Sequence, residues 1–336
     1  MKNNKILITG ITGMVGSHLL DLLINKNSKI YGLYRSSSKL DNIAHHSTKI
    51  NNKRINLIFG DLRDIISIDN VIKLVKPDQV YHLAAQSYPA TSFTNPLETF
   101  DTNINGTEAL LNSLKKYARH AKIHICSSSE VYGRVNKKFV PIKENTPFHP
   151  ASPYAISKVS ADLIGKFYAE AYNMNIFITR MFTHTGPRRT DFFHESSFAK
   201  QIVLIENKIL KPILKVGNLN SMRTYADVRD AVNAYYLLMN SRKTKKGDVF
   251  NIGGDYSCTV GDTLNFLIKN SNVKNIKVVT EKERLRPIDA DLQIPNVEKF
   301  KRTVHWKKKY SYKDTMLDLL DFWRKKIKTN NEYLVR

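Results

Sequence analysis

The stretch Lys5-Ile6-Leu7-Ile8-Thr9-Gly10-Ile11-Thr12-Gly13-Met14-Val15-Gly16 decides the fold of this 336-residue chain. Residues 5–9 form a short apolar run with β-branched side chains, which is typical of a buried parallel strand. Three evenly spaced glycines follow, and leucines at helical spacing come after them. A strand, a glycine-rich turn and a helix in this order let the backbone approach a pyrophosphate at the helix N-terminus. The stretch therefore predicts a dinucleotide-binding α/β unit.

The second predicted strand, at residues 29–34, ends at Arg35. An NAD enzyme often has an acid at this position for the ribose 2′-hydroxyl, whereas an arginine can accommodate a 2′-phosphate. The sequence therefore favours NADP without excluding NAD. The alternative is that Arg35 only stacks on the adenine.

Two later strand ends complete the expected cofactor site. The strand at residues 55–59 is followed by residues that are well placed to meet the adenine, and the strand near residues 80–83 ends in small side chains that permit close approach. The predicted cofactor ligands are Gly10, Thr12, Gly13, Met14, Val15, Gly16, Arg35, Asp61, Leu62, Leu83, Ala84 and Ala85, with Tyr154 and Lys158.

Two further motifs indicate redox chemistry on an alcohol: Ser127-Ser128-Ser129-Glu130-Val131-Tyr132-Gly133 and Tyr154-Ala155-Ile156-Ser157-Lys158. Tyr154 and Lys158 are four residues apart and so share one face of a helix. We expect the ammonium group to favour the phenolate and to lower the pKa of the tyrosine. A hydroxyl from Ser128 can then share the proton of a sugar alcohol while a hydride passes to a nicotinamide. A tyrosine–lysine pair alone is a weak signal, but here a complete dinucleotide unit precedes it.

Glu130 distinguishes between the possible reactions. It lies two residues beyond Ser128, and alternation along a strand would put both side chains on one face. Oxidation of an alcohol to a ketone makes the proton on the neighbouring carbon acidic, and a carboxylate can then remove that proton. A simple C4 epimerase or reductase needs no such base. Ser128, Glu130, Tyr154 and Lys158 are the predicted catalytic residues.

Arginine-bearing turns recur in the second half of the chain, at Arg188 and Arg189 after a Gly-Pro turn, at Arg223 and at Arg286. Arginine is a good ligand for anions because its guanidinium group binds phosphate in a bidentate way. Each of these residues could simply be surface charge. Downstream of a tyrosine–lysine site, they are better explained by a diphosphate and a nucleotide held in a second lobe.

Composition limits the class of protein. The sequence contains no apolar run of about 18 residues, so we expect no membrane span. Its first residues are typical of a strand rather than of a signal peptide. Cys126 and Cys258 cannot form a disulfide framework, so we expect a cytoplasmic protein with reduced cysteines. We find no metal-ligand cluster, and we interpret His45-His46 as a solvated loop pair.

The net charge of +23, from 53 basic and 30 acidic residues, raises the possibility of nucleic-acid binding. The lysines are scattered, however, and no basic stripe with interleaved aromatic residues is present. A cofactor-sensing or nucleic-acid-binding protein on this fold is the non-enzyme alternative. The complete Ser128, Tyr154 and Lys158 set argues against it, since a binding module needs no proton relay.

With these motifs, the chain resembles the extended short-chain dehydrogenases/reductases of the sugar-nucleotide branch over nearly its whole length. Within that branch it is similar to GDP-mannose 4,6-dehydratases, and most similar to the GDP-manno-heptose 4,6-dehydratase group. The segments that carry the resemblance are residues 82–89, 127–133, 152–154, 183–189, Val216-Gly217-Asn218 with Arg223, and 286–291.

The resemblance implies a tightly held NAD(P), a GDP-linked mannose or manno-heptose, and oxidation at C4 as the first step. The substrate contacts that it implies are Ser87, Ser129, Thr183, Arg188, Arg189, Val216, Asn218, Arg223 and Arg286. In the hexose dehydratases the position of Ser128 is usually threonine and that of Thr183 is usually asparagine, and both exchanges could change the fit of the sugar.

Other reactions remain open under this resemblance. The enzyme could stop at the 4-ketone and use a second substrate to reoxidise its cofactor. Residues 198–286 also resemble GDP-4-keto-6-deoxymannose reductases, so a 4-keto reductase or epimerase is a further alternative. The Ser-Glu-Val-Tyr-Gly motif is also similar to one in nucleotide-sugar decarboxylases.

The expected fold class is α/β, a Rossmann-type doubly wound parallel sheet with a smaller C-terminal substrate lobe. We expect the first lobe to cover residues 1–180 with a return segment at about 225–255. The substrate lobe then comprises residues 181–224 and 256–330. The resemblance also implies that helices near residues 97–117 and 154–172 form a four-helix bundle in a homodimer or homotetramer.

Overall fold

A computed structural model describes residues 4–50 and 54–329 of the chain. Its centre is a seven-stranded sheet in the order β10-β6-β5-β4-β1-β2-β3, and every pairing is parallel. The strands are β1 (Asn4–Thr9), β2 (Ser28–Tyr34), β3 (Ile55–Phe59), β4 (Gln79–His82), β5 (Lys122–Ser128), β6 (Asn175–Met181) and β10 (Val249–Ile252). The predicted doubly wound parallel sheet is confirmed. Strand order reverses between β1 and β4, where such folds form a ligand crevice at the carboxyl ends of the strands.

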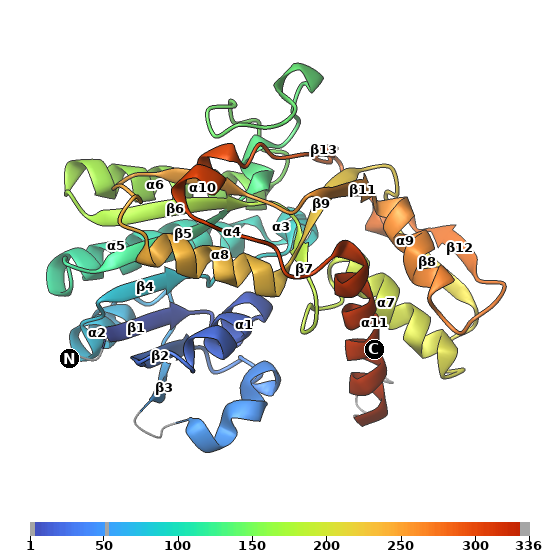
Figure 1. The fold of residues 1–336 in the computed structure, drawn as a ribbon, viewed down its shortest axis with the longest axis horizontal. Helices are drawn as coiled ribbons and strands as arrows, with labels where there is room; N and C mark the ends of the chain where they lie inside the picture. Colours follow the sequence, from blue (N-terminus) through green and yellow to red (C-terminus); the bar gives the residue numbers. More distant parts are fainter. Residues whose placement is uncertain (1–3, 51–53, 330–336) are drawn as a thin grey trace.

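Helices cover both faces of this sheet (Figure 1). On one face lie α1 (Met14–Leu23), α8 (Val228–Asn240) and α10 (Glu298–Thr303), and on the other lie α2 (Ile65–Val75), α5 (Gly106–Tyr117) and α6 (Pro153–Ala171). Ile6 and Ile8 of β1 are buried in the apolar cluster that includes α1 and α8, whereas Leu7 is buried in the cluster that includes α2 and α5. A strand that is covered on both sides must be apolar throughout, as this one is.

The second lobe has a small sheet in the order β11-β9-β13, with β7 also paired to β9, and a two-stranded pair of β12 and β8. Its strands are β7 (His184–Thr185), β8 (Ile213–Val216), β9 (Met222–Asp227), β11 (Tyr256–Thr259), β12 (Lys277–Thr280) and β13 (Leu292–Gln293). The helices α7 (His194–Glu206), α9 (Val260–Lys269) and α11 (Tyr312–Thr329) enclose an apolar core that contains Phe198, Leu264 and Trp323.

Short helical segments complete the described chain. They are α3 (Pro89–Thr94), α4 (Pro96–Phe100), the π-helix η2 (Asp101–Asn105), and the 3-10 helices η1 (Asp41–Lys49), η3 (Ser129–Tyr132), η4 (Lys137–Phe139) and η5 (Lys282–Arg284). None of the helices within residues 4–50 and 54–329 has the length and apolarity needed to cross a membrane.

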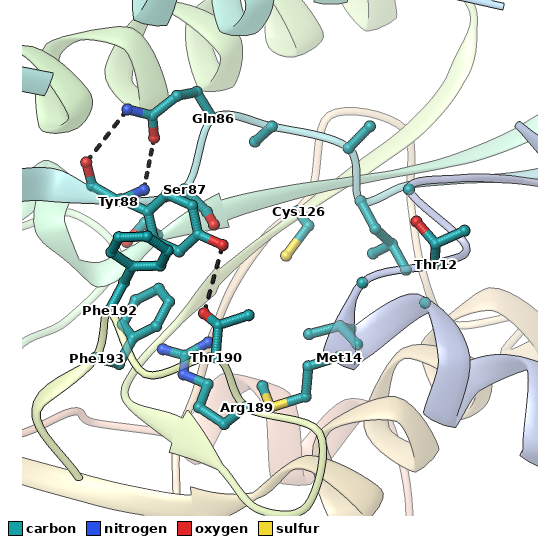
Figure 2. Close-up of a pocket in the computed structure, with 18 of the residues that line it drawn as sticks. Thr12, Met14, Gln86, Ser87, Tyr88, Cys126, Arg189, Thr190, Phe192 and Phe193 are labelled. Atoms are coloured by element: carbon teal, nitrogen blue, oxygen red, sulfur yellow. Dashed lines mark hydrogen bonds between the residues drawn. The ribbon is translucent and has the colours of Figure 1, made fainter. Parts of the chain in front are cut away.

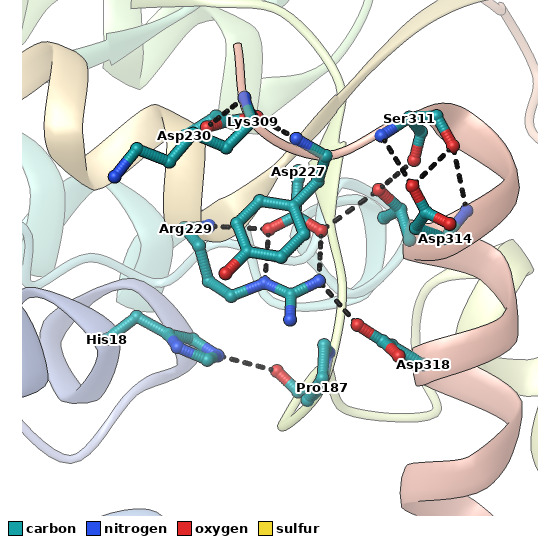
Figure 3. A network of polar contacts seen from close by, with 11 residues as sticks. His18, Pro187, Asp227, Arg229, Asp230, Lys309, Ser311, Asp314 and Asp318 are labelled. Atoms are coloured by element: carbon teal, nitrogen blue, oxygen red, sulfur yellow. Dashed lines mark hydrogen bonds and ion pairs between the residues drawn. The ribbon is translucent and has the colours of Figure 1, made fainter.

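A polar network centred on the buried Asp227 holds the two lobes together (Figure 3). Asp227, at the end of β9, caps α8 and accepts hydrogen bonds from Arg229 Nε at 2.8 Å and Thr315 Oγ1 at 2.9 Å. Arg229 also forms an ion pair with Asp318 of α11 at 2.6 Å. The network therefore holds α11 of the second lobe against the start of α8, which packs on the central sheet.

We propose the same division into lobes as the sequence suggested, except that α10, expected in the substrate lobe, packs against β10 of the central sheet. The strand β10 and helix α8 of the return segment belong to the central sheet and its covering layer. The ends of the proposed division at residues 1–3 and 330, and the short stretch 51–53, lie outside the described residues.

Candidate active site

One cavity of about 770 Å³ runs past the carboxyl ends of the central strands into the second lobe. Most of the predicted site residues line it. They are the predicted cofactor ligands Gly10, Thr12, Gly13, Met14, Val15, Gly16, Arg35, Asp61, Leu62, Leu83, Ala84 and Ala85, the predicted catalytic residues Ser128, Glu130, Tyr154 and Lys158, and Ser87, Ser129, Thr183, Arg188, Arg189, Arg223 and Arg286. The structure thus brings together residues that are up to 276 positions apart in the chain, from Gly10 to Arg286.

The glycine-rich turn forms the end of the cavity beside β1. Gly10 has a φ of +73°, and a Cβ atom there would lie 2.9 Å from the backbone of Ala84. A Cβ atom on Gly16 would lie 2.2 Å from the carbonyl oxygen of Gly10. Only glycine fits both positions, so the turn stays tight and aims the N-terminus of α1 into the cavity. This arrangement suits a pyrophosphate.

A buried histidine that was not predicted from the sequence helps to position Leu83 and Ala84, which line the cavity after β4. His82 Nδ1 lies 2.9 Å from Thr9 Oγ1, which also accepts hydrogen bonds from the backbone amides of Leu83 and Ala84 at 3.1 Å. Its other ring nitrogen lies 3.0 Å from Thr107 Oγ1. Burial lowers the pKa of His82 to about 3, so the imidazole is neutral. The sequence signal that could have identified this histidine is its position at the end of β4, directly before the small residues of the cofactor site.

The catalytic tyrosine and lysine owe their placement to the way α6 begins. Ser152 Oγ accepts a hydrogen bond from the amide of Ala155 at 3.0 Å, and Pro153 occupies the first turn. Tyr154 therefore stands in the first turn and Lys158 in the next, both buried and both lining the cavity. Ser128, the last residue of β5, lies on the same cavity.

The expected lowering of the Tyr154 pKa by Lys158 was wrong in sign. Burial raises the pKa of the phenol above its ordinary value, and a hydrogen bond with Ser128 and the charge of Arg189 offset this only in part. The Lys158 ammonium group donates to the carbonyl oxygen of Cys126 at 2.5 Å, and burial lowers its own pKa. Desolvation therefore outweighs nearby charge at this tyrosine.

The reason given for placing Glu130 beside Ser128 was also wrong. The strand β5 ends at Ser128, and the chain then turns into η3, so strand alternation does not apply to Glu130. Instead the Glu130 amide donates to Ser128 Oγ at 3.2 Å, and the half-buried side chain lines the cavity. The turn into η3, rather than strand alternation, therefore places the Glu130 carboxylate in the cavity.

Arg188 reaches the cavity but is already paired. One guanidinium nitrogen lies 2.8 Å from Asp21 Oδ2, while His45 Nε2 and His46 Nε2 lie 2.8 and 2.7 Å from Asp21 Oδ1. The interpretation of His45 and His46 as a solvated loop pair is therefore corrected, because His46 is buried and both rings bind a carboxylate. Their ligand atoms and that of Asp21 lie within 4.8 Å of one another, as metal ligands could. The separations are those of hydrogen bonds, and Arg188 balances the carboxylate charge.

Arg223 and Arg286 line the part of the cavity formed by the second lobe. Arg223 is buried, and its Nη1 donates to the carbonyl oxygen of Ala290 at 2.6 Å. Arg286 is half-buried, and its nearest carboxylate oxygen, on Asp289, is 3.8 Å away. Two guanidinium groups with few competing anions are a suitable site for a diphosphate.

Val216 and Asn218 do not line the cavity as the resemblance implied. Val216 is 1% exposed and packs in the apolar core of the second lobe. Asn218 Nδ2 donates to Asp289 Oδ2 at 2.8 Å. Their contacts therefore shape the turn that leads to Arg223 rather than the cavity wall.

Comparison with known proteins places this geometry in a family. A family model described as GDP-mannose 4,6 dehydratase matches residues 7–319. The chain belongs to the GDP-mannose 4,6-dehydratase family. It is accordingly an extended short-chain dehydrogenase/reductase and an NAD(P)-dependent enzyme.

Relatives of this family member have moderate sequence identity. The chain is 32% identical over 333 residues to GDP-mannose 4,6 dehydratase 1 of Arabidopsis thaliana, and the match covers 96% of this chain and 90% of that protein. It is 34% identical over 242 residues to GDP-mannose 4,6-dehydratase of Vibrio cholerae, covering 70% of this chain and 64% of that protein.

Solved structures share the fold over nearly the whole chain. The dTDP-glucose 4,6-dehydratase of Bacillus anthracis in complex with NAD is 26% identical, with a TM-score of 0.81 and coverage of 98% of this chain and 99% of that chain. RMD of Pseudomonas aeruginosa complexed with NADPH is 25% identical, with a TM-score of 0.81 and coverage of 96% and 100%.

In this GDP-mannose 4,6-dehydratase family member, an aromatic wall lines the same cavity as the catalytic residues and was not predicted from the sequence. Figure 2 shows its side chains, Tyr88, Phe192 and Phe193. The ring centroids of Tyr88 and Phe192 are 4.8 Å apart, and those of Tyr88 and Phe193 are 5.3 Å apart. The guanidinium carbon of Arg189 lies 3.2 Å from the centroid of Phe193. Thr190 Oγ1 lies 3.4 Å from the Tyr88 hydroxyl. The wall joins the loop after β4 to the turn that carries Arg189.

Proposed function

We propose that the protein is a 4,6-dehydratase that converts a GDP-linked mannose or manno-heptose into the 4-keto-6-deoxy sugar. One observation supports this reading above the others: Glu130 lines the same cavity as Ser128, Tyr154 and Lys158. Oxidation at C4 needs only the last three residues. A carboxylate beside them provides the base that removal of the C5 proton and loss of the C6 hydroxyl require.

The groove beside β1 and β4 fits a dinucleotide, because Gly10 and Gly16 keep the turn tight enough for the N-terminus of α1 to face the cavity. NAD(P) bound there would supply the hydride acceptor for oxidation at C4 and the hydride donor for reduction at C6. Tyr154 takes the proton of the C4 hydroxyl, and Ser128 shares it. Lys158 holds a positive charge beside the developing phenolate. Glu130 then removes the C5 proton and assists the departure of the C6 hydroxyl.

We propose that the diphosphate of the substrate is held by Arg223 and Arg286. Arg188 contributes less than expected, since Asp21 already binds its guanidinium group. The reductase alternative has one supporting observation, the fold shared with RMD of Pseudomonas aeruginosa at 25% identity. A dehydrogenase that stops at the 4-ketone remains the other alternative.

The product decides among these reactions. Purified protein incubated with GDP-mannose, or with GDP-manno-heptose, should yield a product lighter by one water, with no net change in the redox state of the cofactor. Mass spectrometry of the nucleotide sugar and absorbance of the nicotinamide measure these two results. A product that keeps the C6 hydroxyl and leaves reduced cofactor behind would contradict dehydration and favour the dehydrogenase.

We propose NADP as the preferred cofactor. Arg35 is exposed and lines the cavity at the end of β2. The neighbouring acid, Asp61, is paired with Arg63 through hydrogen bonds of 2.7 and 3.1 Å, and so is less available to a ribose hydroxyl. Arg63 thereby balances the charge of Asp61, and Arg35 can bind the 2′-phosphate of NADP.

Changing Arg35 to Asp should shift cofactor preference from NADP towards NAD. A hydrogen bond to a charged group contributes about 1.5–3 kcal/mol, so NADP affinity should fall by about 10- to 100-fold. Titration of the two cofactors against the purified variant measures the shift. Arg54→Asp, an exposed change outside the cavity, is the charge-matched control. An equal loss in both variants would remove Arg35 from this role.

We also propose a cytoplasmic homodimer or homotetramer. Large apolar side chains are exposed on α4 and α6, which pack against each other, and they are Leu97 at 79%, Ile156 at 45%, Leu163 at 50% and Phe167 at 54% exposure. Burial of these side chains against a second copy would remove apolar surface from water.

A further inference from the structure

Glu195, near the start of α7, is a buried acid for which the proposed reaction has no use. Its side chain lines the cavity and is 0% exposed. Neither of its carboxylate oxygens has a hydrogen-bond partner among the described residues. Buried polar atoms are nearly always hydrogen-bonded, because the loss of water is costly otherwise. A buried carboxylate on a cavity wall that accepts no hydrogen bond therefore indicates a donor on the ligand.

The carboxylate is held in its charged form by its surroundings. Burial raises the pKa of Glu195, but the charges of His194 and Arg189 and a contact with Thr185 outweigh burial and lower it overall. Burial lowers the pKa of His194 to about 4, so at neutral pH Arg189 is the cation that acts on Glu195. Arg189 Nε lies 3.3 Å from Glu195 Oε1 and His194 Nδ1 lies 3.4 Å from Glu195 Oε2, but neither contact has hydrogen-bond geometry. Each oxygen can therefore still accept a hydrogen bond from a ligand.

The position of Arg189 places this pair on the sugar side of the cavity. Its charge acts on Tyr154, and its guanidinium group stacks on Phe193 of the aromatic wall. Ser196 Oγ donates to the carbonyl oxygen of Arg189 at 2.7 Å and accepts from Trp323 Nε1 of α11 at 2.9 Å. These bonds tie the Arg189 turn to two helices, so the pair is held rigidly beside the catalytic residues.

The chemistry of a GDP-linked sugar limits which of its groups could donate a hydrogen bond to Glu195. A diphosphate at neutral pH offers no hydroxyl proton and would be repelled by Glu195, which separates this residue from the arginines that we assign to the phosphates. The C4 hydroxyl is engaged by Ser128 and Tyr154, and the C6 hydroxyl belongs beside Glu130. The hydroxyls at C2 and C3 remain.

We propose that Glu195 is a specificity-determining residue whose carboxylate accepts a hydrogen bond from the C2 or C3 hydroxyl of the sugar. The inference rests on the proposed function, since it takes the ligand to be a GDP-linked sugar. A charged acceptor in a dry site discriminates strongly against a substrate that lacks the donor, because the carboxylate is then left unpaired.

The test measures binding of GDP-mannose and its 2-deoxy and 3-deoxy forms to the cofactor-loaded enzyme by calorimetry. The Tyr154→Phe background slows turnover so that binding can be measured. With Glu195 present, removal of one of the two hydroxyls should weaken binding by about 10-fold or more. The Glu195→Leu variant should bind GDP-mannose as weakly as the Glu195-containing enzyme binds that deoxy sugar. In this variant, removal of the same hydroxyl from the sugar should change the affinity little. Glu195→Gln, which keeps a neutral acceptor and the side-chain size, should restore part of the preference.

The control is Glu206→Gln, at the far end of the same helix. Glu206 is paired with Arg324 at 2.7 Å and does not line the cavity, so the preference for the hydroxyl should be unchanged. An equal loss for all three sugars in Glu195→Leu would show that the acid only holds Arg189, and would overturn the inference. An equal loss for GDP alone would also overturn it, by placing the contact on the nucleotide. Failure of the Glu195-containing enzyme to bind either GDP-mannose or GDP-manno-heptose would instead overturn the proposed function.

Discussion

Replacing Tyr154 with phenylalanine should lower turnover by a factor of about 10² or more, which is the range for loss of a general acid–base group. This factor corresponds to about 2.7 kcal/mol in the activation free energy. The ring fills the same space, so binding of the cofactor and of GDP-mannose should change little. Steady-state kinetics with calorimetric binding separates the two effects. The loss should therefore appear in kcat rather than in the dissociation constants.

The dependence on pH gives an independent check of this role. Phenolate is the form of Tyr154 that accepts the substrate proton, and burial raises the pKa of the phenol. The active form is thus the minor form at neutral pH, and kcat/KM of the wild type should increase as the pH is raised. The same increase should be missing from Tyr154→Phe.

Tyr168→Phe is the matched control, because Tyr168 is a buried tyrosine of the same helix that does not line the cavity. Its hydroxyl donates to Glu108 at 2.5 Å, so this variant should lose stability of about 1 kcal/mol and keep its turnover. Near-normal turnover of Tyr154→Phe, or an equal loss in both variants, would contradict the assigned role.

The parts of this site that the sequence predicts are those that local backbone constraints determine. The turn from Gly10 to Gly16 could be identified because a tight turn leaves no room for a side chain, whatever the rest of the chain does. Tyr154 and Lys158 could be paired because a helix fixes the relation of residues four apart. The order of strands then follows from the alternation of strands and helices along the chain.

The parts that could not be predicted depend on contacts between distant segments. The sign of the Tyr154 pKa is set by burial, which depends on the packing of α6 against the whole fold. The pairing of Arg188 with Asp21 joins residues that lie far apart in the chain and meet only in the folded protein. Glu130 shows a milder case, since its position beside Ser128 was expected but the end of β5 was not.

Replacing Glu130 with glutamine should separate the two halves of the reaction. Glutamine keeps the size of the side chain but cannot take a proton at neutral pH. Oxidation at C4 by Tyr154, Ser128 and Lys158 should proceed, and the reaction should stop before water is lost. Reduced nicotinamide should therefore accumulate on the enzyme at up to one equivalent, which absorbance in a single turnover measures. Product formation should fall by about 10²-fold or more.

Isotope exchange shows whether Glu130 is the base at C5. In deuterated water the wild type should place deuterium at C5 and carry the original C4 hydrogen to C6, and Glu130→Gln should do neither at an appreciable rate. Glu144→Gln is the control, because this acid lies in the loop before α6 and does not line the cavity. Glu130→Gln that still loses water at the wild-type rate would assign the base to another group. A variant that forms no reduced cofactor at all would instead show that Glu130 acts earlier, in oxidation at C4, because removal of a C5 base alone cannot prevent hydride transfer from C4.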